Sequence, residues 1–124
     1  MGADIDTIAK NFADHYCQTF DNQREGLAKY YREQSMLHFE GEARLGRESI
    51  MEKLTNSFLK TQHRISTFDA QPTNIVPGAV LILVNGEVLI DDEPRALQFT
   101  QTFHLIPDDK SYWLLNDIFR LTYS

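Results

Sequence analysis

The sequence predicts an α+β domain in which helices come first and a sheet of antiparallel strands follows. Up to about residue 58, apolar side chains recur at steps of three and four, the period of a helix with one buried face. From about residue 63 onward they alternate or run without interruption, as they do in strands. The chain has 124 residues, 42% of them hydrophobic, which suits one globular domain. We therefore expect a single domain over residues 1–124, with its helices packed on one face of the sheet.

Three helices are expected in the first half of the chain. The first spans residues 4–20, where Asp4 and Asp6 favour the positive N-terminal end of the helix. After the break at DNQ, the segment REGLAKYYRE predicts a short second helix. Gly46 precedes the third, RESIMEKLTNSF. The apolar stripes are Ile5, Ile8, Phe12, Tyr16 and Phe20 in the first helix and Ile50, Met51, Leu54 and Phe58 in the third.

The strands are expected in the remaining segments. A short one lies in SMLHFEG, between the second and third helices. Four longer ones follow from His63 onward and form an antiparallel meander, with a turn at the DD that precedes Lys110. Their sequences are HRISTFDAQP, AVLILVNGEVLI, ALQFTQTFHLI and YWLLNDIFRLTY.

The last of these strands has apolar side chains on both faces. Alternation places Trp113, Asp117 and Phe119 on one side and Leu114 and Ile118 on the other. One face of the sheet meets the helices, and the other should be exposed to solvent. Because Leu114 and Ile118 are apolar, we expect a second copy of the chain to cover them in a homodimer.

Composition excludes several classes of function. The net charge of −6, without a basic stripe, argues against nucleic-acid binding, which depends on neutralising phosphates. Cys17 is the only cysteine, so neither an internal disulfide nor a cysteine-based zinc cluster is possible. The four histidines are scattered, no glycine-rich phosphate loop is present, and no apolar run is long enough to span a membrane. We expect a cytosolic or nuclear protein that needs no cofactor and no metal.

The segment LIDDEP places Asp91, Asp92 and Glu93 side by side at the tip of a predicted hairpin. A turn needs only one or two residues that tolerate turn geometry, and Asp serves well there. Glu is not a turn residue, so the third charge is surplus to folding. Such a tip is most often solvated surface. A binding role needs further evidence.

That evidence comes from longer segments that resemble the nuclear transport factor 2 family. They are NFADHYCQTFDNQREGLAKYY, ESIMEKLTNSF, TQHRISTFDAQPT and NDIFRL, together with FEG and LIDDEP. The likeness covers nearly the entire chain, in order and with matching gaps. It implies a homodimeric cone of three helices on a strongly bent antiparallel sheet. It also implies binding to the GDP form of the GTPase Ran and to phenylalanine–glycine repeats of nuclear pore proteins. Such a protein carries Ran into the nucleus, moving between the cytoplasm, the nuclear pore of the envelope and the nucleus.

The resemblance also implies roles for individual residues. Glu40, Asp91 and Glu93 match acids that rim a hydrophobic cavity and pair with basic side chains of Ran. Phe39 matches an aromatic wall of the cavity, which receives an aromatic side chain of Ran. Asp92 lies between the matched acids and adds only to the electrostatic field.

The repeat site is implied at Ile5, which stands where the family has an aromatic residue near the dimer seam. An aliphatic side chain can still pack against Phe, without the aromatic pairing that contributes roughly 0.5–1.5 kcal/mol.

Two other classes of protein remain open. The same cone fold hosts isomerases and dehydratases that use a pocket acid, and Tyr16, His38 and Asp117 could converge on such a pocket. Nothing in the sequence demands this chemistry, so we expect no enzyme and no catalytic residues. A passive dimerisation module would keep the sheet-to-sheet seam and lack the acidic residues at 40 and 91–93.

Overall fold

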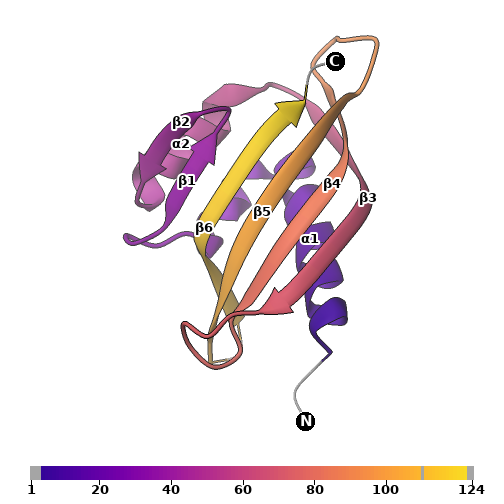
Figure 1. Cartoon of the computed structure of the whole chain (residues 1–124). Helices are drawn as coiled ribbons and strands as arrows, with labels where there is room; N and C mark the ends of the chain where they lie inside the picture. The colour runs from indigo at the N-terminus through magenta and orange to yellow at the C-terminus, as the bar shows by residue number, and fades with distance from the viewer. Residues whose placement is uncertain (1–3, 110, 123–124) are drawn as a thin grey trace.

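The computed structural model describes residues 4–109 and 111–122 (Figure 1). The three predicted helices and the five predicted strands are confirmed, although the second helix is a 3₁₀ helix. A short strand that follows the Glu40–Gly41 turn was not predicted. In chain order the elements are α1 (Ile5–Asn22), η1 (Arg24–Tyr30), β1 (Met36–Phe39), β2 (Glu42–Leu45), α2 (Arg47–Ser57), β3 (Thr61–Pro72), β4 (Val80–Ile90), β5 (Leu97–Asp108) and β6 (Ser111–Thr122). Within the described ranges, no helix has both the length and the apolar character needed to cross a membrane.

The strands form one sheet in the order β2-β1-β6-β5-β4-β3. All neighbours are antiparallel except β1 and β6, which run parallel, with Leu37 beside Asp117 and Phe39 beside Phe119. The predicted antiparallel meander of the four long strands is confirmed, but the sheet as a whole is mixed rather than antiparallel, because β1 joins β6 in parallel. Alternation in a four-residue strand predicts which side chains are buried but carries no information about strand direction.

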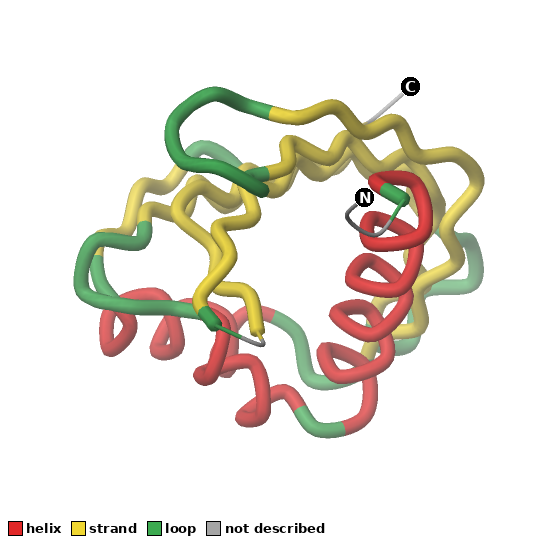
Figure 2. The backbone as a smooth tube through the Cα atoms, turned by 90° about the horizontal axis from the view of Figure 1, so that it is seen from below, coloured by secondary structure: helices red, strands yellow, loops and turns green. Residues whose placement is uncertain are grey.

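The sheet is strongly curved, and the helices close its concave side (Figure 2). α1 presents the small side chains Ala9 and Ala13 to the interior, each at most 1% exposed, which allows close packing on the sheet. A single main core forms between the helices and the concave face. Its largest fully buried side chains are Tyr16, Tyr31, Phe99, Phe103, Leu27, Leu37, Ile50, Leu54, Ile82, Leu105, Leu114 and Val80.

A bulge bends the sheet where β3 pairs with β4. Ile65 pairs with Gly86 and Thr67 with Asn85, so Ser66 is an extra residue. Gly86 is required at this point, because a Cβ there would lie 2.3 Å from the carbonyl oxygen of Arg64.

A second bulge reverses the faces of β6. His104 pairs with Asn116 and Leu105 with Leu114, so Leu115 is the extra residue. Leu114 therefore points into the main core and is 0% exposed. Trp113, which was expected to share a face with Asp117, packs on the convex side in a small cluster. The prediction that Leu114 lies on the dimer face is wrong, because alternation breaks between it and Ile118.

The convex side of the sheet, called the outer face below, carries exposed apolar side chains. Ile118 lies between His38 of β1 and Thr102 of β5 and is 50% exposed. The other exposed apolar side chains on this face are Met36, Leu45, Leu81 and Leu83. No helix of the described chain covers them.

Candidate functional site

Both groups of predicted binding acids lie at one end of the sheet. β1 and β4 run in the same direction as β6, so the turn after β1 and the loop after β4 emerge at the same end (Figure 1). We call Glu40, Asp91, Asp92 and Glu93 the acidic rim.

Glu40 occupies an unfavourable position in the turn between β1 and β2. Glu40 and Gly41 both have positive φ, 54° and 89°, the arrangement of a two-residue hairpin turn that favours Asn-Gly. A glutamate is less favourable than an asparagine in this left-handed conformation. Its side chain therefore has a role other than forming the turn. Part of that role is structural, because the carboxylate accepts the backbone N–H of Leu121. The N–H of Glu40 also donates to the carbonyl of Phe119 at 3.0 Å.

An aromatic stack lies beneath this turn. The ring of Phe39 stacks on Phe119 with centroids 4.7 Å apart and contacts Phe58 at 5.7 Å. Phe119 continues the stack to Phe99 at 5.8 Å. Phe39 is only 4% exposed, so its ring is buried next to the Glu40–Gly41 turn and is not open to solvent.

Two open hollows flank the rim on the helix side. The larger, of about 510 Å³, is lined by residues of α1, β3 and β4, among them Asp21 and His63, and by Lys60 and Asp91 from the segments next to these strands. The smaller, of about 230 Å³, includes Arg24, Phe58 and Leu59 in its lining. Phe39 lines neither hollow.

Asp91 ties the acidic loop to residues 58–60, which we call the connector because they join α2 to β3. Its Oδ1 accepts the backbone N–H groups of Leu59 and Lys60, each at 2.9 Å. Its own N–H donates to the carbonyl of Lys60 at 2.8 Å. Asp91 has a φ of 51°, which Asp tolerates better than most residues. This acid, expected only to meet a partner, is also an anchor of the fold.

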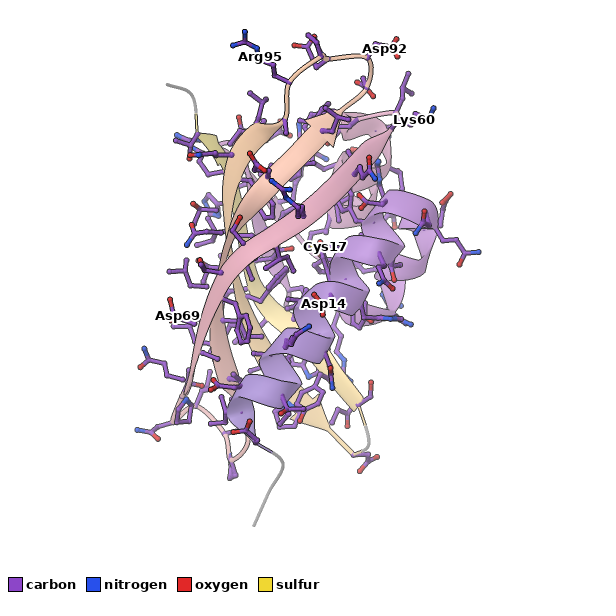
Figure 3. All side chains as sticks on the ribbon, turned by 90° about the vertical axis from the view of Figure 1, so that its right-hand side faces the viewer. Asp14, Cys17, Lys60, Asp69, Asp92 and Arg95 are labelled. Carbon is purple, nitrogen blue, oxygen red and sulfur yellow. The ribbon has the colours of Figure 1, made fainter. Side chains whose placement is uncertain are left out.

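The other two acids of the loop are available to a partner. Within the described chain, the carboxylates of Asp92 and Glu93 have no hydrogen bond or ion pair, and both residues are exposed. Lys60 and Arg95 lie at the same end of the molecule (Figure 3). The three acids of the loop, Lys60 and Arg95 together carry a formal charge of −1. Lys60 was missed in the sequence because it lies thirty residues from the loop.

A second anchor that sequence reasoning missed lies below the connector. Asp21 accepts hydrogen bonds from Thr61 Oγ1 at 2.7 Å and from the backbone N–H of His63 at 2.8 Å. Its carboxylate also pairs with His63 Nδ1 at 2.6 Å. Burial favours a higher pKa for Asp21, but the contacts with His63 outweigh it and lower the pKa below its usual value. Asp21 thus fixes the start of β3 against α1.

The residues proposed for an enzyme do not form an accessible site. The phenol of Tyr31 donates to Asp117 at 2.6 Å, and Tyr16 donates to the same carboxylate at 3.3 Å. Gln101 donates to the other carboxylate oxygen at 2.9 Å. These four side chains are at most 4% exposed, so a substrate cannot reach them. The expectation that His38 could join Tyr16 and Asp117 is wrong, because His38 lies exposed on the outer face. Among the described residues, no three side chains of His, Cys, Asp or Glu are grouped as metal ligands.

Asp117 should make the stability of the protein depend on pH. Burial raises its pKa to about 6, although hydrogen bonds from Tyr31 and Gln101 oppose the rise. In the unfolded chain its pKa is about 3.9. Between these values the folded state binds more protons, so the free energy of unfolding falls as pH rises from about 4 to about 6. The loss should be on the order of 3 kcal/mol.

The measurement is urea unfolding of the wild type and Asp117→Asn from about pH 4 to about pH 8. The difference in free energy between the two proteins isolates Asp117 from the other titrating groups. The wild type should lose stability relative to the variant as pH rises and change little above pH 7. Parallel curves for the two proteins would contradict the prediction.

Comparisons with known proteins agree with this geometry. Residues 8–121 match the family model described as the nuclear transport factor 2 (NTF2) domain. The chain is 50% identical to nuclear transport factor 2 of Debaryomyces hansenii over 125 aligned positions, covering 100% of both chains. It is 48% identical to the protein of the same name from Schizosaccharomyces pombe, covering 98% of each.

Solved structures show the same fold. Nuclear transport factor 2 from Cryptosporidium parvum superposes with a TM-score of 0.88 at 36% identity, covering 95% of this chain and 94% of that one. A structure described as a scytalone dehydratase, from Novosphingobium aromaticivorans, reaches a TM-score of 0.76 at 16% identity, covering 96% and 85%. The second likeness shows the fold alone.

Proposed function

Because the chain belongs to the nuclear transport factor 2 family, we propose that it binds Ran in its GDP form and carries it into the nucleus. The observation that carries the proposal is the acidic rim above the aromatic stack. Glu93 keeps an exposed carboxylate that the described chain does not use. Charges placed in this way steer a basic partner and fix its orientation. The protein would move between the cytoplasm and the nucleus through the nuclear pore.

The rim acids contribute unequally to this proposal. Glu93 is the principal partner for a basic side chain of Ran. Asp91 offers only the carboxylate oxygen that the connector leaves unused, and Glu40 holds the end of β6 with part of its carboxylate. We propose that Asp91 and Glu40 both contact Ran and that each also has a role in the fold. Asp92 contributes only to the electrostatic field around the loop.

We place the phenylalanine–glycine repeat site at Ile5. Ile5 is the first residue of α1, and its partly buried side chain packs against the main core. α1 begins at the end of the molecule opposite the acidic rim (Figure 1). This separation would allow Ran and a repeat segment to bind the same molecule at once.

We also propose that the protein is a homodimer joined through the outer face. Ile118 lies near the middle of the exposed apolar side chains described above, and a symmetric contact there would cover the same surface on both copies. Monomeric proteins rarely leave so many neighbouring apolar side chains exposed on one face.

Affinity capture tests the proposal. The wild-type protein on beads should retain Ran from purified mixtures when GDP is supplied and release it when GTP is supplied. A second column of the same beads should retain a phenylalanine–glycine repeat peptide, and Ile5→Asp should retain less of it. Equal retention of Ran with both nucleotides, or none, would contradict Ran-GDP binding. Unchanged retention of the peptide by Ile5→Asp would remove Ile5 from the repeat site.

A further inference from the structure

Leu59 is the most exposed large apolar side chain in the described chain. It is 95% exposed, whereas the next, Leu45, is 65% exposed. An isolated exposed leucine is common and by itself implies nothing. The surroundings of Leu59 are what distinguish it.

The backbone of the connector is held from two sides. Arg24 stacks on the ring of Phe20 at 4.4 Å and donates to the carbonyls of Leu54, at 3.1 Å, and Phe58. From the opposite side, Asp91 accepts the N–H of Leu59 at 2.9 Å. The backbone on both sides of Leu59 is therefore fixed while its side chain projects into solvent. A contact made by such a residue loses little backbone entropy when a partner binds.

The hydrogen bond from Leu59 also holds its backbone beside Asp91 of the acidic rim. Any partner whose cation reaches Asp91 must come close to Leu59, because the backbone of one residue is bonded to the side chain of the other. The next residue, Lys60, brings a positive charge that would repel a purely basic partner surface. An apolar contact at Leu59 would offset that repulsion and would restrict binding to surfaces with a matching shape.

We propose that Leu59 is a specificity-determining contact of the acidic rim. Its side chain enters an apolar depression on the GTPase, next to the basic side chains that Glu93 and Asp91 meet. The inference rests on the proposed binding of Ran-GDP and names a residue on which that binding depends. Burial of most of a leucine side chain predicts that Leu59→Ala weakens binding on the order of 10-fold.

Calorimetric titration of Ran-GDP tests the inference with the wild type, Leu59→Ala and a matched control, Ile75→Ala. Ile75 is also exposed, at 54%, and lies in the loop between β3 and β4, at the end of the molecule away from the rim (Figure 1). Leu59→Ala should bind about 10-fold more weakly, and Ile75→Ala should bind like the wild type. All three proteins should melt at the same temperature, because neither side chain contributes to the core.

Repeating the titration at high salt separates the apolar contact from the charges. The loss caused by Leu59→Ala should persist at about 0.5 M salt, where exposed charge pairs are screened. If the wild type binds Ran-GDP and Leu59→Ala binds equally well, the role of Leu59 is overturned and the proposed function stands. If the wild type does not bind Ran-GDP, the proposed function fails, and the role of Leu59 fails with it.

Discussion

Replacing Glu93 with lysine should weaken the binding of Ran-GDP about 30-fold to several thousand-fold, while the melting temperature stays unchanged. The reversal places two cations opposite each other in a contact that is partly desolvated, which costs about 2–5 kcal/mol. The fold should not respond, because the exposed Glu93 carboxylate has no contact in the described chain. Calorimetric titration at low and at about 0.5 M salt measures the effect, which should shrink as the Debye length contracts.

The matched control is Asp92→Lys, which changes the same charge one residue away and should have a much smaller effect. Asp91 and Glu40 need milder substitutions, because lysine there would also remove backbone hydrogen bonds of the fold. Asp91→Asn keeps an oxygen for the N–H groups of Leu59 and Lys60, and Glu40→Gln keeps one for Leu121. Both should weaken binding less than Glu93→Lys does. Wild-type affinity in Glu93→Lys would remove Glu93 from the Ran site.

Replacing Ile118 with glutamate should convert the dimer to monomers. The symmetric contact would bring two carboxylates close to the shared axis and remove them from water, at a cost of several kcal/mol. Ile118 is 50% exposed within one chain, so the isolated chain should tolerate the change. Sedimentation of the wild type and the variant at micromolar concentration measures the difference.

Leu59→Glu is the control for that experiment, since it makes the same kind of change on a more exposed side chain away from the outer face. It should sediment as a dimer, like the wild type. A wild-type protein that sediments as a monomer would refute the dimer, and a dimeric Ile118→Glu would place the interface elsewhere.

The helices and long strands were predictable because helical spacing in the first half of the chain gives way to alternating or continuous apolar sequence in the second. The bulge in β6 was not predictable, because Trp113, Leu114 and Leu115 are all apolar and each of them suits either face of the strand. Helical spacing did not indicate the burial of Cys17 either, because it lies outside the apolar stripe expected for the first helix. It is 6% exposed, and burial raises its pKa to about 12.

The candidate site was predictable only in part. The resemblance indicated the positions of the rim acids, and the structure brings Glu40 and the acidic loop to one end of the sheet. The hydrogen bonds of Asp91, the cation of Lys60 and the exposure of Leu59 all depend on the connector meeting the loop. Such a contact between segments about thirty residues apart leaves no periodic pattern in the sequence.

The position of β6 inside the sheet constrains the order of assembly during synthesis. β1 and β2 are made early, yet within the sheet β1 pairs only with β2 and with β6, the last strand described. Until the ribosome has released β6, the β1–β2 hairpin lacks its neighbouring strand, although Arg44 and Glu42 can already pair with Glu52 and Lys53 of α2. A two-stranded hairpin without further strands is marginally stable in water. The carboxylate of Glu40 likewise has no Leu121 to bind. The Glu40 side of the rim is therefore completed only after translation has passed residue 121.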